Sequence, residues 1–150
     1  MLRIIVLFLS CTLPAHAVTL TQTVIGDVLF DLTPLAPADA GDYFNNSYAR
    51  DLTQLSVDNI PNDVTWTIFA RISSEIPGIT VRVRRKGTGT GAINPSGGTS
   101  YKKLTTTYKK LFTGEGKRFD IPMRTQLKGI GVSDNNGIFE THVEYKVETD

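Results

Sequence analysis

The sequence contains few of the residues on which enzymes and small secreted domains depend. Among its 150 residues are one cysteine and two histidines, and the cysteine, Cys11, lies in an N-terminal segment that we expect to be cleaved. A mature chain without cysteine has neither a disulfide nor a thiolate nucleophile. Its single remaining histidine leaves little from which to build a zinc site or a Ser-His-Asp arrangement. We therefore expect no catalytic residue, no bound metal and no cofactor.

Long apolar runs are also scarce. The main one lies near the N-terminus, where Arg3 precedes a short apolar stretch and Ala15-His16-Ala17 provides the small-x-small pattern of a cleavage site. This run is shorter than the ~20 residues that cross a bilayer as a helix, so it predicts a signal peptide at 1–17. We expect an exported protein, periplasmic, cell-surface or extracellular, with no transmembrane segment in its mature chain. The alternative is a lipoprotein acylated at Cys11, whose preceding residues match such a site poorly.

The remaining 150 − 17 = 133 residues suffice for one domain with a sizeable core, and we assign 18–150 to a single domain. No segment shows the three-to-four-residue spacing of an amphipathic helix. The dominant pattern is period-2 alternation, and it is clearest at 63–72. One parity of that segment is apolar and comprises Val64, Trp66, Ile68, Ala70 and Ile72. The other, expected nearer water, carries Thr65, Thr67 and Arg71, with Phe69 as its single apolar residue. This pattern predicts a strand with one buried face, which places the only tryptophan in the core.

Similar alternation marks further strands along the chain. They are predicted within 18–32, 51–60, 79–84, 101–112, 119–132 and 139–147. In 119–132 the residues that alternate with polar neighbours are Phe119, Ile121, Met123, Thr125 and Leu127. Glycine, proline and asparagine mark the connections, which are a loop at 34–46, a flexible loop at 86–100, a turn at 113–116 and a hairpin turn at 134–137. Short strands separated by such turns predict an all-β fold, an antiparallel immunoglobulin-like β-sandwich.

Charge is unevenly distributed along the mature chain, in which fifteen bases balance fifteen acids once Arg3 is removed. Segment 82–128 carries twelve Lys and Arg against Glu115 and Asp120, a local charge of +10. The candidate residues for binding a polyanion are Arg82, Arg84, Arg85, Lys86, Lys102, Lys103, Lys109 and Lys110. One interpretation is that acidic and basic strands simply pair across the sheet. The others are a face for an anionic polysaccharide and a complementary seam for self-association. Nucleic acid is not an expected partner of an exported protein.

The segment 136–147, NGIFETHVEYKV, resembles the closing strand of bacterial secreted pilin-like and spore-coat-type immunoglobulin-like domains. The resemblance implies an extracellular structural subunit. In subunits assembled by the chaperone–usher route, a neighbour's N-terminal extension supplies the missing last strand. The residues that would form such a donor strand here are Val18, Leu20 and Val24. Those subunits commonly carry a disulfide, which this mature chain lacks, and the alternative is that 18–32 is the first strand of a complete sandwich.

These patterns together predict a secreted, non-enzymatic structural or surface subunit, of a fimbrial or pilin-like kind, that assembles by strand addition. Its partners would be copies of itself, a related subunit or a chaperone. The alternative is a self-contained extracellular binding module that uses its basic face to hold anionic glycans. An enzyme ranks third, because no catalytic motif is present in the sequence.

Overall fold

The computed structural model describes residues 18–24, 47–129 and 141–150. The predicted signal peptide, the loop at 34–46 and the hairpin turn at 134–137 lie outside these residues. Within the described ranges, no helix is long and apolar enough to cross a membrane. The regular elements are the strands β1 (Thr19–Val24), β2 (Ser47–Asp58), β3 (Thr65–Ile72), β4 (Thr80–Arg85), β5 (Ser96–Gly97), β6 (Lys102–Lys103), β7 (Lys109–Glu115), β8 (Arg118–Lys128) and β9 (Val143–Thr149).

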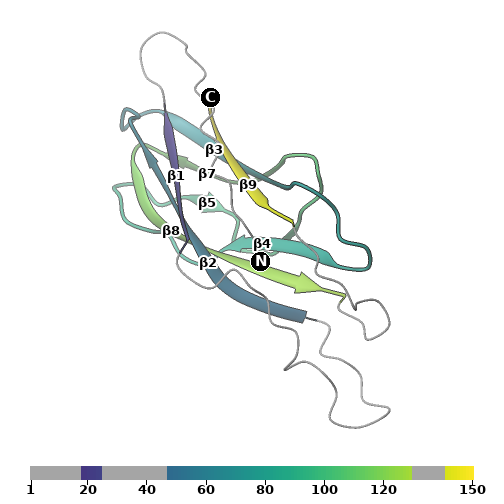
Figure 1. The fold of residues 1–150 in the computed structure, drawn as a ribbon. Helices are drawn as coiled ribbons and strands as arrows, with labels where there is room; N and C mark the ends of the chain where they lie inside the picture. The colour runs from purple at the N-terminus through teal and green to yellow at the C-terminus, as the bar shows by residue number, and fades with distance from the viewer. Residues whose placement is uncertain (1–17, 25–46, 130–140) are drawn as a thin grey trace, which may run out of the picture.

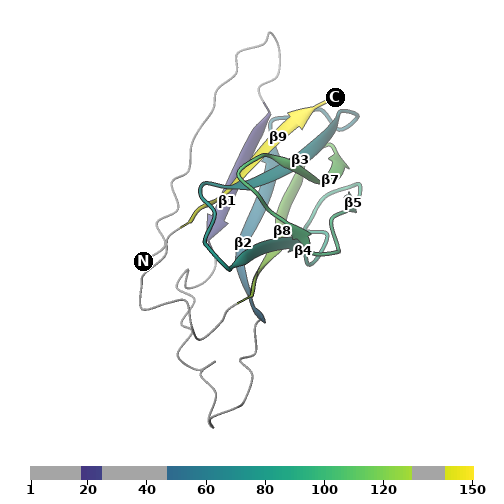
Figure 2. The same ribbon diagram turned by 90° about the vertical axis from the view of Figure 1, so that its right-hand side faces the viewer.

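The strands form two sheets that pack face to face (Figure 1). One sheet has the order β1-β2-β8-β4-β6, and the other has the order β5-β7-β3-β9. Every ladder between these strands is antiparallel. Figure 2 shows β1 and β5 toward opposite sides of the sandwich. The predicted all-β antiparallel sandwich is confirmed.

The core lies between the sheets, and β3 runs through its centre. Trp66, Ile68 and Ala70 are fully buried, which confirms the predicted inner face of this strand. Phe69 is half-buried on the outer face, as its parity requires. Thr67 was expected on the wetter face but is only 4 % exposed, because β7 and β9 flank it on both sides. A central strand therefore buries part of its outer face as well.

The alternation of buried and exposed side chains along β8 is interrupted near the start of the strand. Phe119 shares the parity of Ile121 and Met123, yet it is 37 % exposed, whereas Arg118 is only 2 % exposed. The backbone of Asp120 has a φ of 55°, and the register between β2 and β8 shifts beside it. An irregularity of this kind adds a residue to one strand and reverses its side-chain alternation. The predicted inner position of Phe119 is therefore wrong.

The turn predicted at 113–116 begins later than expected. Strand β7 continues to Glu115, and the turn comes at Gly116, whose φ is 63°. A Cβ atom at this position would lie 2.9 Å from the carbonyl oxygen of Asn62. Both the left-handed backbone and the lack of space therefore favour glycine at this turn.

Candidate functional site

The two lateral sides of the sandwich end in strands of very different length. On one side the sheets end in β1, with six residues, and β9, with seven. On the other side they end in β6 and β5, with two residues each. A long edge strand offers a row of unpaired backbone groups to another chain, whereas a short one offers few. We call the side formed by β1 and β9 the open side.

The backbone of β9 presents alternate residues to its outer edge. The carbonyl oxygen of His142 accepts a hydrogen bond from Ser73 N–H at 2.9 Å, and Asp150 N–H donates to the carbonyl oxygen of Thr65 at 3.3 Å. Residues of an antiparallel strand that bond to one neighbour alternate with residues whose N–H and C=O point the other way. The even-numbered residues of β9 therefore bond to β3. The odd-numbered residues that point to the edge are Val143, Tyr145, Val147 and Thr149.

Apolar side chains on the open side remain half-exposed while they pack against the core. They are Val18, Leu20, Val143, Tyr145 and Val147. Among the described residues, β3 is the only strand that pairs with β9. Within the part of the chain that the structure describes, the edge of β9 therefore combines unpaired backbone groups with apolar side chains that a further strand would cover.

The phenol of Tyr145 spans the space between the two sheets. Its hydroxyl is buried near the Thr53 hydroxyl of β2. The geometry between the two hydroxyls does not meet the criteria of a hydrogen bond. Burial raises the pKa of Tyr145 to about 12, and the neighbouring Thr53 hydroxyl opposes that rise. The position of this side chain shows that β9 lies over β2.

The segment predicted as a donor strand lies in the sheet of its own chain. β1 pairs with β2 from Thr19 opposite Asp58 to Val24 opposite Thr53. Leu20 packs against the core, and Val18 does so just before the strand begins. This arrangement matches the alternative in which the segment is the first strand of a complete sandwich.

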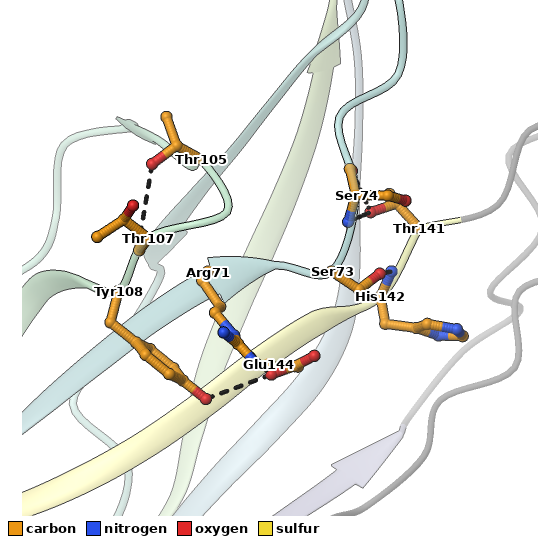
Figure 3. Close-up of polar contacts among 9 residues, drawn as sticks. All are labelled: Arg71, Ser73, Ser74, Thr105, Thr107, Tyr108, Thr141, His142 and Glu144. Carbon is orange, nitrogen blue, oxygen red and sulfur yellow. Dashed lines mark hydrogen bonds and ion pairs between the residues drawn. The ribbon is translucent and has the colours of Figure 1, made fainter.

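Charged and aromatic side chains meet on the outer face of the β5-β7-β3-β9 sheet. Figure 3 shows Arg71 and Tyr108 converging on Glu144. Arg71 Nε donates to Glu144 Oε2 at 2.7 Å, and the Tyr108 hydroxyl donates to the same oxygen at 3.3 Å. The bond to Glu144 raises the pKa of Arg71, whereas burial raises the pKa of Tyr108. Lys146 lies over the Tyr108 ring and pairs with Glu148 at 2.5 Å. Charges of alternating sign thus follow one another along the outer face of β9.

Arg85, one of the predicted polyanion-binding residues, lies inside the fold. It is 5 % exposed, and its guanidinium donates to backbone carbonyl oxygens of the loop at 86–100. The acceptors are Gly87, Pro95 and Gly97. Burial lowers the pKa of Arg85, and the charge of Arg118 lowers it further. Arg85 is therefore not part of an exposed basic face.

Arg118 holds the same loop from β8. Its guanidinium donates to the backbone carbonyl oxygens of Thr88, Gly89 and Ile93 and to the side-chain oxygen of Asn94. The loop at 86–100 is thus anchored by two buried arginines, which its composition, predicting a flexible connection, did not indicate. The sequence did indicate the burial of Arg85, because Arg85 continues the alternation of the buried residues Val81 and Val83 along β4. The burial of Arg118 could not be predicted in this way, because the irregularity at Asp120 reverses the side-chain alternation of β8.

The remaining predicted basic residues are exposed or half-exposed, and two of them contact an acidic or an aromatic side chain. Lys86 Nζ pairs with Asp51 at 2.5 Å, which offsets its charge. The Arg84 guanidinium lies 4.8 Å from the centre of the Tyr101 ring. We call Arg84 and the five residues described next the basic edge.

These five residues lie on β4, β6 and β7, and they are Arg82, Lys102, Lys103, Lys109 and Lys110. Arg82 stands opposite Lys103 in the β4–β6 ladder, and like charges in opposite positions destabilise such a pair. Lys102 Nζ donates to the carbonyl oxygen of Lys110 at 2.7 Å, which joins the basic residues of the two sheets. None of the five belongs to an ion pair within the described part of the chain.

Comparison with known proteins identified no family: no family model, curated protein or solved structure matches this chain. Within residues 18–24, 47–129 and 141–150, no cluster of three or more His, Cys, Asp or Glu side chains could hold a metal ion. The structure therefore directs attention to two features, the edge of β9 on the open side and the basic edge opposite it.

Proposed function

We propose that this protein is an exported, non-enzymatic structural or surface subunit that assembles by strand addition at the edge of β9. The observation that carries the proposal is the contrast between the two sides of the sandwich. The edge of β9 is seven residues long, whereas the edge strands on the opposite side have two residues each. Main-chain hydrogen bonds to an added strand provide affinity, and the half-exposed apolar side chains provide a surface for it to cover.

The same geometry favours assembly at the edge of β9 over the release of β1 as a donor strand. β1 is already paired with β2 along its whole length, so its release as a donor would break those bonds and expose Leu20. The edge of β9 needs no such rearrangement, because its odd-numbered residues already point outward. Assembly at this edge therefore leaves the sandwich intact.

The proposal is tested by light scattering coupled to size-exclusion chromatography over a wide concentration range. The unmodified chain should associate as its concentration rises. Val147→Pro should shift the protein toward monomer, because it removes an N–H that points to the edge and that β3 does not use. Val147→Thr is the matched control, since it retains the N–H and should associate as the unmodified chain does.

A second proline variant tests the same edge in case Val147→Pro fails to fold. Thr149→Pro removes the next outward N–H near the exposed end of β9, and thermal melts should show that this variant remains folded. A folded, concentration-independent monomer formed by the unmodified chain would overturn the proposal. So would association that both proline variants leave unchanged.

A second candidate function is favoured by Arg82 standing opposite Lys103 with no ion-pair partner in the described residues. We propose as this alternative that the basic edge binds an anionic glycan. Retention on heparin should weaken steeply with salt, because exposed charges are screened within ~10 Å at 0.1 M. Reversal of Arg82 and Lys110 to Glu should reduce retention far more than reversal of Lys117 and Lys128. Equal losses in the two double variants would refute a localised site.

A further inference from the structure

The edge of β9 is suited to pair with the β9 of a second copy of this chain, and this inference rests on the proposed strand addition. Two antiparallel strands can pair through their outward groups only if odd-numbered residues face odd-numbered residues. A few registers satisfy this condition over most of the strand. They differ in which charged side chains meet on the outer face, so the charges on the described residues discriminate between them.

One register brings opposite charges together. When Tyr145 faces the partner's Tyr145, Glu144 lies opposite the partner's Lys146, and two-fold symmetry repeats this pair. Such cross-strand pairs of opposite charge stabilise antiparallel strands. On the inner face the same register sets Val143 opposite the partner's Val147, which extends the apolar row. This register therefore pairs the outward backbone groups, brings opposite charges together on the outer face and aligns apolar side chains on the inner face.

The neighbouring registers bring like charges together. A shift in one direction places Lys146 opposite the partner's Lys146, and Glu144 then faces the partner's Glu148. A shift in the other direction places Glu144 opposite the partner's Glu144. Like charges in opposite positions destabilise a strand pair. The register centred on Val147 also sets Lys146 opposite the partner's Glu148, but it brings Glu144 opposite the partner's Asp150 and places Tyr145 opposite the partner's exposed Thr149 on the inner face. Charges and apolar side chains together therefore favour the register centred on Tyr145.

We infer that two copies pair through β9 in an antiparallel, two-fold symmetric arrangement with Tyr145 on the axis. The two four-stranded sheets then join into one sheet of eight strands, since each copy contributes β5, β7, β3 and β9. A two-fold contact uses the same surface on both subunits and closes on itself. The unit of assembly at this edge is therefore a dimer.

Cysteine cross-linking of the full chain tests the register directly. Glu144→Cys and Lys146→Cys are prepared separately in a Cys11→Ser background, so that each chain has one thiol. Residues 144 and 146 of opposing strands form a pair without mutual hydrogen bonds, with Cα atoms ~4.5 Å apart, a distance that a disulfide spans. Mixing the two variants should give a disulfide-linked heterodimer, and neither variant alone should cross-link. A mixture of Lys146→Cys with Lys103→Cys is the control and should remain unlinked.

Each other outcome contradicts the inference in a distinguishable way. Cross-linking of Glu144→Cys alone, or of Lys146→Cys alone, would establish one of the shifted registers and leave strand addition standing. Association that is sensitive to Val147→Pro but gives no cross-link would exclude the register centred on Tyr145. A mixture of Lys146→Cys with Glu148→Cys would then separate the register centred on Val147, which cross-links, from a different strand at the edge, which does not. A monomer at every concentration would refute the proposed function as well.

Charge exchange provides an independent measurement. Lys146→Glu places like charges together twice per dimer, so the dimer dissociation constant should rise roughly tenfold. The double variant Glu144→Lys/Lys146→Glu restores opposite charges across the interface, although it removes the Arg71–Glu144 ion pair within each chain, and it should recover most of that loss in an Arg71→Gln background, where that pair is absent. Equal weakening by the single and double variants would show that these side chains do not face each other across the interface.

Discussion

Gly114 lies directly beneath the indole of Trp66. A Cβ atom at position 114 would stand 2.2 Å from Cζ2 and 2.3 Å from Cη2 of that ring. The two residues are opposite each other in the β3–β7 ladder, and the ring is held in place because Nε1 donates to the carbonyl oxygen of Gly116 at 2.7 Å. The glycine of β7 thus makes the space that the only tryptophan occupies.

We expect Gly114→Ala to destabilise the fold by about 1–3 kcal/mol, the usual cost of overpacking a core. The indole cannot move aside without weakening its bond to Gly116, so the near-ultraviolet circular dichroism of Trp66 should change as well. Glu115→Ala, at the next position of the same strand, is the control and should have a smaller effect. An unchanged melting temperature and spectrum for Gly114→Ala would contradict the close contact.

Trp66→Ala should cost about 3–5 kcal/mol, the range for truncation of a buried aromatic side chain. Trp66 is fully buried and meets Phe112 edge to face with ring centres 6.1 Å apart. Thr65→Ala on the exposed parity should cost far less. Chemical denaturation followed by far-ultraviolet circular dichroism measures both. Fluorescence of a water-exposed indole in the unmodified protein would be incompatible with this core.

Arg85→Lys should loosen the loop at 86–100, because a lysine ammonium cannot reproduce the planar fork of the guanidinium. Carbonyl acceptors left unpaired in the interior cost about 1–3 kcal/mol each. Hydrogen exchange should accelerate across the loop, while the amides of β3 should retain their protection. Arg82→Lys, on the outward parity of the same strand, should leave exchange unchanged. Slow exchange in both variants would show that Arg85 does not anchor the loop.

Tyr145 should make the fold sensitive to alkali. Its pKa is about 12 in the folded protein and ~10 in an unfolded chain, so above pH 10 the unfolded state releases the phenolic proton first. Stability is therefore complete below pH 10 and declines as the pH rises to about 12. Tyr145→Phe should flatten this decline in the free energy of unfolding measured between pH 9 and 12. Tyr108→Phe is the control for a more exposed phenol.

Period-2 alternation was sufficient to identify the interior strands, because one face of each sheet is buried. It placed Trp66 and Ile68 in the core and predicted the outward position of Phe69. It failed at Phe119, because a positive φ at Asp120 changes the phase of β8, and no local pattern signals this. The burial of Thr67 was equally hidden, since it depends on which strands flank β3.

The candidate site shows the same division. The composition predicted a basic cluster, but it could not show that Arg85 turns inward, although its parity with Val83 pointed that way. The order of the strands in each sheet depends on long-range pairing, which local sequence patterns do not determine. The position of β9 at the end of its sheet therefore had to come from the structure. The sequence did contain the alternating charges of β9, but their meaning depends on knowing which residues face the edge.

The hydrogen-bond acceptors of Arg85 and Arg118 determine how the loop at 86–100 responds to acid. Nearly all are backbone carbonyl oxygens, which carry no titratable charge, and the one side-chain acceptor is the amide of Asn94. The contact of Lys117 with Asp58 depends instead on a carboxylate, whose pKa is lowered by the backbone N–H of Asn59 and by Lys117. Strong acid would therefore remove this ion pair from the outer face while the glycine-rich loop stays in place.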